Sequence, residues 1–129
     1  MARALLDTSV LVAADERLDL ELPPSAAISV ITVGELVAGV RLARSPASRE
    51  ERVVRLAAVR RAFLPLPVDE EVAERYGDVL AAARRRRRAV KATDLLIVAT
   101  ALASRRTLYT LDGAQASLAQ LVDAPVRTV

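Results

Sequence analysis

The chain has 129 residues, of which 53% are hydrophobic, and its 19 basic and 16 acidic residues give a formal net charge of +3. It contains neither cysteine nor histidine, which excludes disulfides, thiolate nucleophiles, Cys/His zinc sites and imidazole acid–base catalysis. Any hydrolytic chemistry must therefore use carboxylates, hydroxyls, the single Lys91, arginines and a metal held by oxygen ligands, which favours Mg²⁺ or Mn²⁺.

The length and apolar content predict one globular domain over residues 1–129. Apolar runs such as 95–103 are far shorter than the roughly 20 residues of a membrane span, and no cleavable leader precedes the first strand-like segment. We therefore expect a cytoplasmic protein that does not enter a membrane.

The first half of the chain alternates short apolar segments with helical patterns. In order, we expect strand 2–6, turn 7–9, helix 10–14, a polar link ending at Pro23-Pro24, strand 26–29 and helix 32–43. The next helix covers 46–63, with Ser45 or Ser48 as its N-cap. Its apolar positions at helical spacing are Val53, Val54, Ala57 and Ala58.

The second half continues the alternation. Two prolines make 64–68 an edge strand or an extended link. After it we expect a helix over 69–88, a helix that begins at Asp94, strand 107–111, helix 114–121 and strand 126–129. This alternation predicts an α/β sandwich around a mostly parallel sheet, in which functional groups gather at the carboxyl ends of the strands.

Two aspartates follow predicted strands. Asp7 comes after an apolar strand and before a helix, and Asp112 lies between the strand at 107–111 and Gly113. Each has a structural interpretation, Asp7 as a helix N-cap and Asp112 as a turn residue at a strand end. Thr8 and Ser9 could cap the helix equally well, which leaves Asp7 partly unexplained.

Glu35 and Asp94 lie on predicted helices with few other charges. The spacing Thr32-x-x-Glu35 fits a capping box, yet Glu35 points away from the apolar stripe of its helix, toward the side of Ala38, Gly39 and Leu42. A carboxylate among such neighbours needs a partner, and a metal would be one. Asp94 has Thr93 before it as a candidate N-cap, and the helix behind it has no polar face.

An α/β topology could bring the four acids Asp7, Glu35, Asp94 and Asp112 together. Clustered carboxylates repel one another, and a fold tolerates them chiefly when cations neutralise them. Oxygen ligands around a hard divalent ion would also let a bound water act as the nucleophile without any histidine.

An unbroken run of five arginines covers Arg84, Arg85, Arg86, Arg87 and Arg88. One interpretation is a solvated helix end, because the helix begins with acids at 69–71 and basic residues are favoured at its other end. The alternative is binding to nucleic-acid phosphates. Both can hold at once.

The sequence resembles the PIN-domain nucleases, and among them the VapC-type toxins of bacterial toxin–antitoxin pairs. The segments that carry the resemblance are LLDTSVLVA (5–13), SVITVGELVAGV (29–40), ERYGDVLAAARRR (74–86), KATDLLIVATAL (91–102) and TLYTLDGA (107–114). They occur in the family's order and close to its spacing over nearly the whole chain. The sequence departs from many family members after Asp112, where it has Gly113-Ala114-Gln115 instead of a further acid, Asn or aromatic residue.

The resemblance implies a PIN-like three-layer α/β/α sandwich and a metal-dependent endoribonuclease, the toxin of a type II system, in which a metal-activated water hydrolyses single-stranded or loop RNA. It assigns Asp7, Glu35, Asp94 and Asp112 to an acidic Mg²⁺ or Mn²⁺ site. Thr110 matches a hydroxyl position that helps to shape the site. The implied partners are RNA, a small cognate antitoxin and a second copy in a homodimer, with the five arginines as candidate contacts to the RNA backbone.

Two other classes were weighed against this interpretation. A phosphotransfer receiver domain would show adjacent acids after the first strand and a lysine late in the chain, whereas Thr8 follows Asp7 and Lys91 precedes the late helix. A PIN-like module that binds RNA or protein without cutting it is the alternative function. The presence of all four acids favours an enzyme.

Overall fold

The computed structural model describes residues 3–14 and 22–129; residue 2 of the first expected strand and residues 15–21 of the expected link lie outside this part. The described strands are β1 (Ala4–Leu6), β2 (Ala26–Ser29), β3 (Leu64–Leu66), β4 (Thr107–Thr110) and β5 (Val126–Thr128). They form one five-stranded sheet in the order β3-β2-β1-β4-β5. Every pairing in it is parallel, as the alternation of strands and helices predicts.

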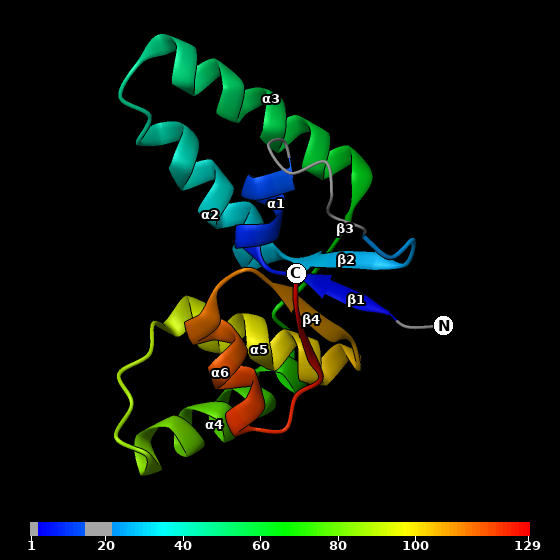
Figure 1. The fold of residues 1–129 in the computed structure, drawn as a ribbon, viewed down its shortest axis with the longest axis vertical. Coiled ribbons are helices and arrows are strands. Elements are labelled where there is room, and N and C mark those ends of the chain that lie inside the picture. The colour runs from blue at the N-terminus through cyan, green and yellow to red at the C-terminus, as the bar shows by residue number, and fades with distance from the viewer. Residues whose placement is uncertain (1–2, 15–21) are drawn as a thin grey trace.

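Six helices are described on the two faces of this sheet. They are α1 (Thr8–Ala14), α2 (Val30–Arg41), α3 (Pro46–Ala62), α4 (Glu70–Arg85), α5 (Ala92–Ser104) and α6 (Gly113–Leu121). Figure 1 shows α1, α2 and α3 above the sheet and α4, α5 and α6 below it, with the α2–α3 hairpin extending outward at the top. The result is a three-layer α/β/α sandwich. None of these helices is long and apolar enough to cross a membrane.

The core is divided by the sheet into two layers. Leu5 and Leu108 face the layer formed with α4, α5 and α6, whereas Leu6 and Tyr109, one residue further along the same strands, face α1, α2 and α3. This is the period-2 alternation of a strand with both faces covered. The central strand β1 is therefore fully buried, and the neighbouring strand β4 is buried at Leu108, Tyr109 and Thr110, where it ends beside β1.

Most helix starts follow from capping residues. Ser45 accepts a hydrogen bond from the Ser48 amide at the start of α3, and Asp69 accepts one from Val72 at the start of α4. The capping-box interpretation of Thr32 and Glu35 is wrong, because α2 begins two residues earlier with Ser29 as its N-cap.

The start of α5 also differs from expectation. The helix begins at Ala92 rather than Asp94, and Thr93 lies inside its first turn instead of capping it. Lys91 occupies the N-cap position, and no side chain caps the helix. Asp94 remains in the first turn, where the helix dipole favours a negative charge.

The buried face of α3 is not the one that the sequence suggests. Val53 and Val54 are 47% and 61% exposed, and Ala58 is exposed too. The packed stripe is instead Leu56, Val59 and Phe63, which joins the layer around α1 and α2. Both stripes have helical spacing, so only the tertiary contacts of α3 decide between them.

We predict that Val59→Ala lowers the free energy of unfolding by about 1–2 kcal/mol, because it removes two buried methyl groups. The matched substitution Val54→Ala, on the exposed side of the same helix, is expected to change it by less than about 0.5 kcal/mol. Urea denaturation of both variants measures the difference. A larger loss for Val54→Ala than for Val59→Ala would show that α3 packs through the other stripe.

Candidate active site

The candidate site lies where the direction of the sheet topology reverses. From β1 the order runs through β2 to β3 on one side, while β4 and β5 lie on the other, so β1 and β4 flank the switch point. In open α/β sheets, ligands bind at the carboxyl ends of the strands beside such a point. Asp7 follows β1 directly, and Thr110 is the last residue of β4.

Asp7 is the most tightly held of the four acids. Only 6% of it is exposed, and its Oδ2 accepts hydrogen bonds from Ser9 Oγ at 2.8 Å and from Thr110 Oγ1 at 2.7 Å. Each hydroxyl also accepts a bond from a backbone amide, Ser9 from Leu111 and Thr110 from Asp112. Each hydroxyl thus accepts one bond from an amide and donates its single proton to Asp7 Oδ2.

Glu35 is positioned from the opposite layer. Its half-buried side chain accepts a hydrogen bond of 2.8 Å from Thr8 Oγ1, which also lies 3.1 Å from the buried hydroxyl of Thr32. Thr8 follows Asp7 in the chain, so α1 supplies a hydroxyl for each of two acids: Ser9 for Asp7 and Thr8 for Glu35. The second turn of α2 is thereby fixed against the start of α1.

Asp94 and Asp112 are joined through the helices that carry them. Asp112 is the N-cap of α6, and its Oδ1 accepts a hydrogen bond of 2.9 Å from the Ala114 amide. The buried side chain of Gln115, one turn into α6, donates from Nε2 to the backbone carbonyl of Asp94 at 3.2 Å. The sequence predicts Asp112 as a turn residue after a strand; in the structure it also caps the helix that follows, and its side chain is exposed.

Burial and mutual repulsion raise the pKa of two of these carboxyl groups. For Glu35 the largest cause is desolvation, and Asp7 and Asp94 raise the pKa further, against lowering by the Thr8 hydrogen bond and Lys91. The pKa of Asp94 is raised by desolvation, then by Asp7 and Asp112, against lowering by Lys91. These interactions link all four acids into one electrostatic cluster, hereafter the acidic cluster.

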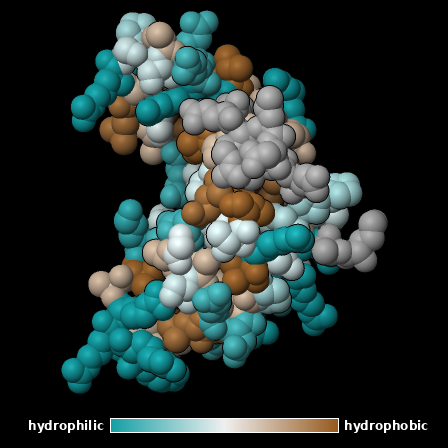
Figure 2. Space-filling model, in the orientation of Figure 1, coloured by the Kyte–Doolittle hydropathy of each residue, from teal (hydrophilic) through white to brown (hydrophobic). Residues whose placement is uncertain are grey.

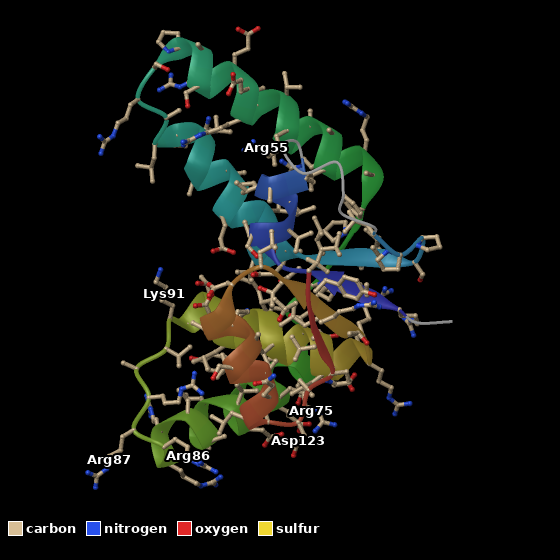
Figure 3. All side chains as sticks on the ribbon, viewed as in Figure 1. Arg55, Arg75, Arg86, Arg87, Lys91 and Asp123 are labelled. Carbon is tan, nitrogen blue, oxygen red and sulfur yellow. The ribbon has the colours of Figure 1, made fainter. Side chains whose placement is uncertain are left out.

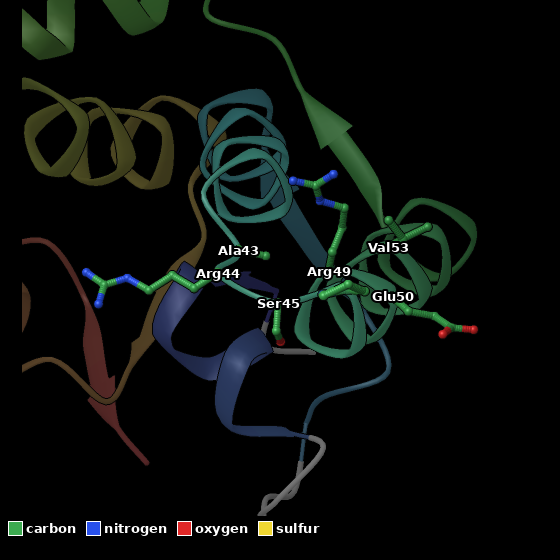
Figure 4. A pocket seen from close by; sticks show the side chains of 7 residues that line it. Ala43, Arg44, Ser45, Arg49, Glu50 and Val53 are labelled. Carbon is green, nitrogen blue, oxygen red and sulfur yellow. The ribbon is translucent and has the colours of Figure 1, made fainter.

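Two hollows lie near α2. The larger, about 450 Å³, is at the α2–α3 turn, where Ala43, Arg44 and Arg49 line it (Figure 4), and none of the four acids does. The smaller, about 200 Å³, lies against Thr8 and Glu35. The smaller one is relevant to the chemistry because it touches the acidic cluster.

The donor chemistry of the acidic cluster suits a hard divalent cation, since every side chain in it offers only oxygen. Across residues 3–14 and 22–129, however, no three acidic side chains converge as a ready-made cage for a metal ion. Mg²⁺ commonly takes only one or two protein carboxylates and keeps several waters. Asp7 and Asp94 could act in that way, with Glu35 and Asp112 contacting the waters.

Comparison with known proteins identifies the family. The family model described as "PIN domain" matches residues 4–121. The chain belongs to the PIN-domain family. It is 42% identical over 100 residues to "Ribonuclease VapC8" of Mycobacterium tuberculosis, covering 75% of this chain and 88% of the relative.

Solved structures agree with this assignment. A crystal structure of VapBC-5, a member of the VapBC family of toxin–antitoxin systems from Mycobacterium tuberculosis, matches with TM-score 0.83 and 32% identity and covers 100% of this chain and 98% of that chain. FitAcB from Neisseria gonorrhoeae matches with TM-score 0.78 and 28% identity over 95% of each chain. The predicted family and its sandwich fold are confirmed.

Sequence reasoning about this PIN domain missed its supporting side chains. Thr8 and Ser9 appeared only as possible caps, and Gln115 only as a departure from the family pattern. The signal that could have found the hydroxyls is their number, because one N-cap would be enough and the segment has two hydroxyls beside Asp7. In the structure neither precedes α1 as a cap, since both lie inside the helix and bind carboxylates. The structure brings Thr110 to Asp7, whereas nothing in the spacing of the sequence indicates the bond from Gln115 to Asp94.

We predict that Asp94→Asn melts at the same temperature as the wild-type PIN domain or higher in EDTA at pH 7. The raised pKa means that the folded state binds this proton more tightly than the unfolded chain. Protonation of Asp94 therefore stabilises the folded state. This stabilisation is complete below the pKa of Asp94 in the unfolded chain, about 3.9, and is lost as the pH rises through its pKa in the folded state. The charged carboxylate therefore costs stability at pH 7, and the variant removes that cost.

The advantage of Asp94→Asn is expected to disappear as the pH falls below about 4, where the wild-type carboxyl is itself protonated. Thermal melts across this pH range measure it. Asp123→Asn is the matched control, because it makes the same change at an exposed acid outside the cluster. If Asp94→Asn instead unfolds the protein, Asp94 is mainly a structural partner of the core.

Proposed function

We propose that the protein is a metal-dependent endoribonuclease, the toxin of a type II toxin–antitoxin system. The observation that carries the proposal is the acidic cluster at the β1/β4 switch point, with Asp7 held rigidly by Ser9 and Thr110. The named relative is a ribonuclease, and the solved neighbours come from toxin–antitoxin systems. The same reaction in this chain would place it in the cytoplasm, where RNA is available.

The chain's residues have distinct roles in this proposal. Both hydroxyls bind Oδ2 of Asp7, so its Oδ1 is the oxygen presented to a ligand. Asp94 and Asp7 would hold Mg²⁺ or Mn²⁺, while Glu35 and Asp112 orient water around it. When bound, such a cation lowers the pKa of a water and neutralises charge on the phosphate. Burial raises the pKa of Glu35, so its carboxylate would be a stronger proton acceptor than a solvent-exposed glutamate.

The proposed substrate is bound through its phosphates rather than its bases. The only aromatic residues are Phe63, Tyr76 and Tyr109, and all three pack into the two core layers. These three aromatic side chains therefore do not form a surface on which successive bases could stack. Guanidinium groups pair well with phosphate, and Arg84 to Arg87 are exposed at the end of α4.

The proposed protein partners are a small cognate antitoxin and a second copy of the chain. The neighbours described as toxin–antitoxin complexes support the antitoxin. A short reading frame for it is expected immediately upstream. Size-exclusion chromatography of the purified chain measures the homodimer, and elution as a monomer at micromolar concentration would contradict it.

We predict that the protein cleaves single-stranded RNA with Mg²⁺ or Mn²⁺ and that EDTA abolishes cleavage. Asp94→Asn should lower the rate by at least about 100-fold, the scale at which a single preorganised electrostatic group acts. Asp123→Asn should cleave as the wild type does. Gel analysis of a labelled RNA measures all three.

Equal cleavage by the wild type and Asp94→Asn would defeat the assignment of the site. RNA binding without any cleavage, together with no binding of Mn²⁺ by calorimetry, would favour the non-cutting module instead.

We predict that replacing Arg84 and Arg85 by Ala weakens RNA binding. The plot of log K against log salt concentration should become less steep by about 1.4, because each lost phosphate contact to a single strand accounts for about 0.7. The matched control is Arg60→Ala with Arg61→Ala, which removes the same charge from the last turn of α3. Fluorescence anisotropy in EDTA measures both. An unchanged slope would assign Arg84 and Arg85 to the solvated helix end alone.

A further inference from the structure

Lys91 is an unusual residue at an unusual position. It is the one lysine among the 19 basic residues of the chain. It occupies the N-cap of α5, where Ser, Thr, Asp and Asn are strongly preferred, and it provides no side-chain cap. Its positive charge also opposes the helix dipole at that end. Stability alone therefore selects against lysine at this position.

The surroundings of Lys91 supply a different reason for its presence. It is exposed and forms no ion pair within the described part of the chain. Its charge acts on both Glu35 and Asp94, whose carboxyl pKa values it lowers. Lys91 is thus a cation at the border of the acidic cluster that is not committed to any one carboxylate.

The five arginines cover the end of α4 and the start of the connection that leads to Lys91 and α5. Arg84 and Arg85 form the last turn of α4, and Arg88 is three residues before Lys91, at most about 11 Å away along the chain. Figure 3 shows Arg86, Arg87 and Lys91 on one side of the molecule, with Lys91 nearer to the sheet. Figure 2 shows this side hollowed between the α2–α3 hairpin and the helices below.

We propose that Lys91 binds the RNA phosphate at the border of the acidic cluster and is the last contact of a basic track that begins at Arg84. The inference rests on the proposed function and adds a substrate-binding residue to it. Four carboxylates repel an incoming phosphate, so a cation is needed where the strand meets them. The arginines lie at the α4 end of the connection, and Lys91 is the basic residue at its α5 end, three residues before Asp94.

A lysine suits this position better than an arginine. Its ammonium group is a compact point charge with three donors on a flexible stem, so it can follow a phosphate as the strand moves. An arginine would form a bidentate ion pair with Glu35 or Asp94, because two N–H groups of its planar guanidinium can donate to both oxygens of a carboxylate. That pair would occupy a carboxylate that the proposed metal requires.

Substitution of Lys91 by Ser separates binding from stability. Serine supplies the missing cap of α5, so Lys91→Ser should raise Tm by about 2–6 °C. The same change should lower kcat/KM for RNA cleavage with Mn²⁺ by about 10- to 100-fold, the loss expected for one charge-assisted contact. The salt slope of RNA binding in EDTA should flatten by about 0.7.

Two further variants complete the test. Arg60→Ser removes one exposed positive charge at the end of α3 and should leave kcat/KM and the salt slope unchanged. Lys91→Arg should keep the wild-type salt slope of RNA binding, because the positive charge is kept. It should not give the full cleavage rate, because the arginine would pair with Glu35 or Asp94.

The outcomes distinguish this inference from the proposed function. If the wild type cleaves RNA and Lys91→Ser raises Tm without changing kcat/KM or the salt slope, Lys91 is not a substrate contact and the inference is overturned. If the wild type does not cleave, the proposed function fails. In that case the anisotropy measurement still decides the inference. If the wild type binds RNA and Lys91→Ser does not, the inference is supported. If both bind equally, or if neither binds, it is overturned.

Discussion

The bond from Thr110 to Asp7 joins the two strands at the switch point of the sheet. The residues are 103 positions apart, and the 2.7 Å hydrogen bond forms only when β4 has paired with β1 in its observed register. Ser9 adds a second bond to the same oxygen and accepts the amide of Leu111, so the ends of both strands close around one buried carboxylate. The remaining acids are placed relative to this point, by α1 for Glu35 and by α6 for Asp94.

The acids of the site lower the stability of the fold. Glu35 and Asp94 are partly removed from water and repel Asp7, and both effects raise their pKa. Two devices limit the cost: hydroxyl donors satisfy Asp7 and Glu35, and the dipole of α5 favours the charge on Asp94. Repelling, partly buried acids break a local rule of stability, which is typical of functional sites. The open N-terminus of α5 belongs to the same pattern, because a capping side chain there would stand among the acids.

Much of the fold follows from local sequence signals, and the exceptions have one cause. Strand 26–29 and the capping roles of Ser45 and Asp69 are decided by nearby residues. The buried face of α3 and the start of α5 depend on contacts with other elements, which the period of the pattern does not contain. The same division holds for the site. The four acids could be chosen from the sequence because they follow strands or lie on helices with few other charges and match the family's motifs, whereas the bond from Gln115 to Asp94 requires the docking of α6 on α5.

The absence of a preformed metal cage bears on how the proposed enzyme binds its two ligands. Asp7 and Asp94 repel each other, and in the proposal a bound cation would neutralise both. A phosphate approaching the same place meets less negative charge once the cation is bound. The coupling is reciprocal, and RNA must therefore raise the affinity for the cation by the same factor. Lys91 reduces the negative charge from the protein side, so in the proposal its removal would weaken RNA binding most where the cation is absent.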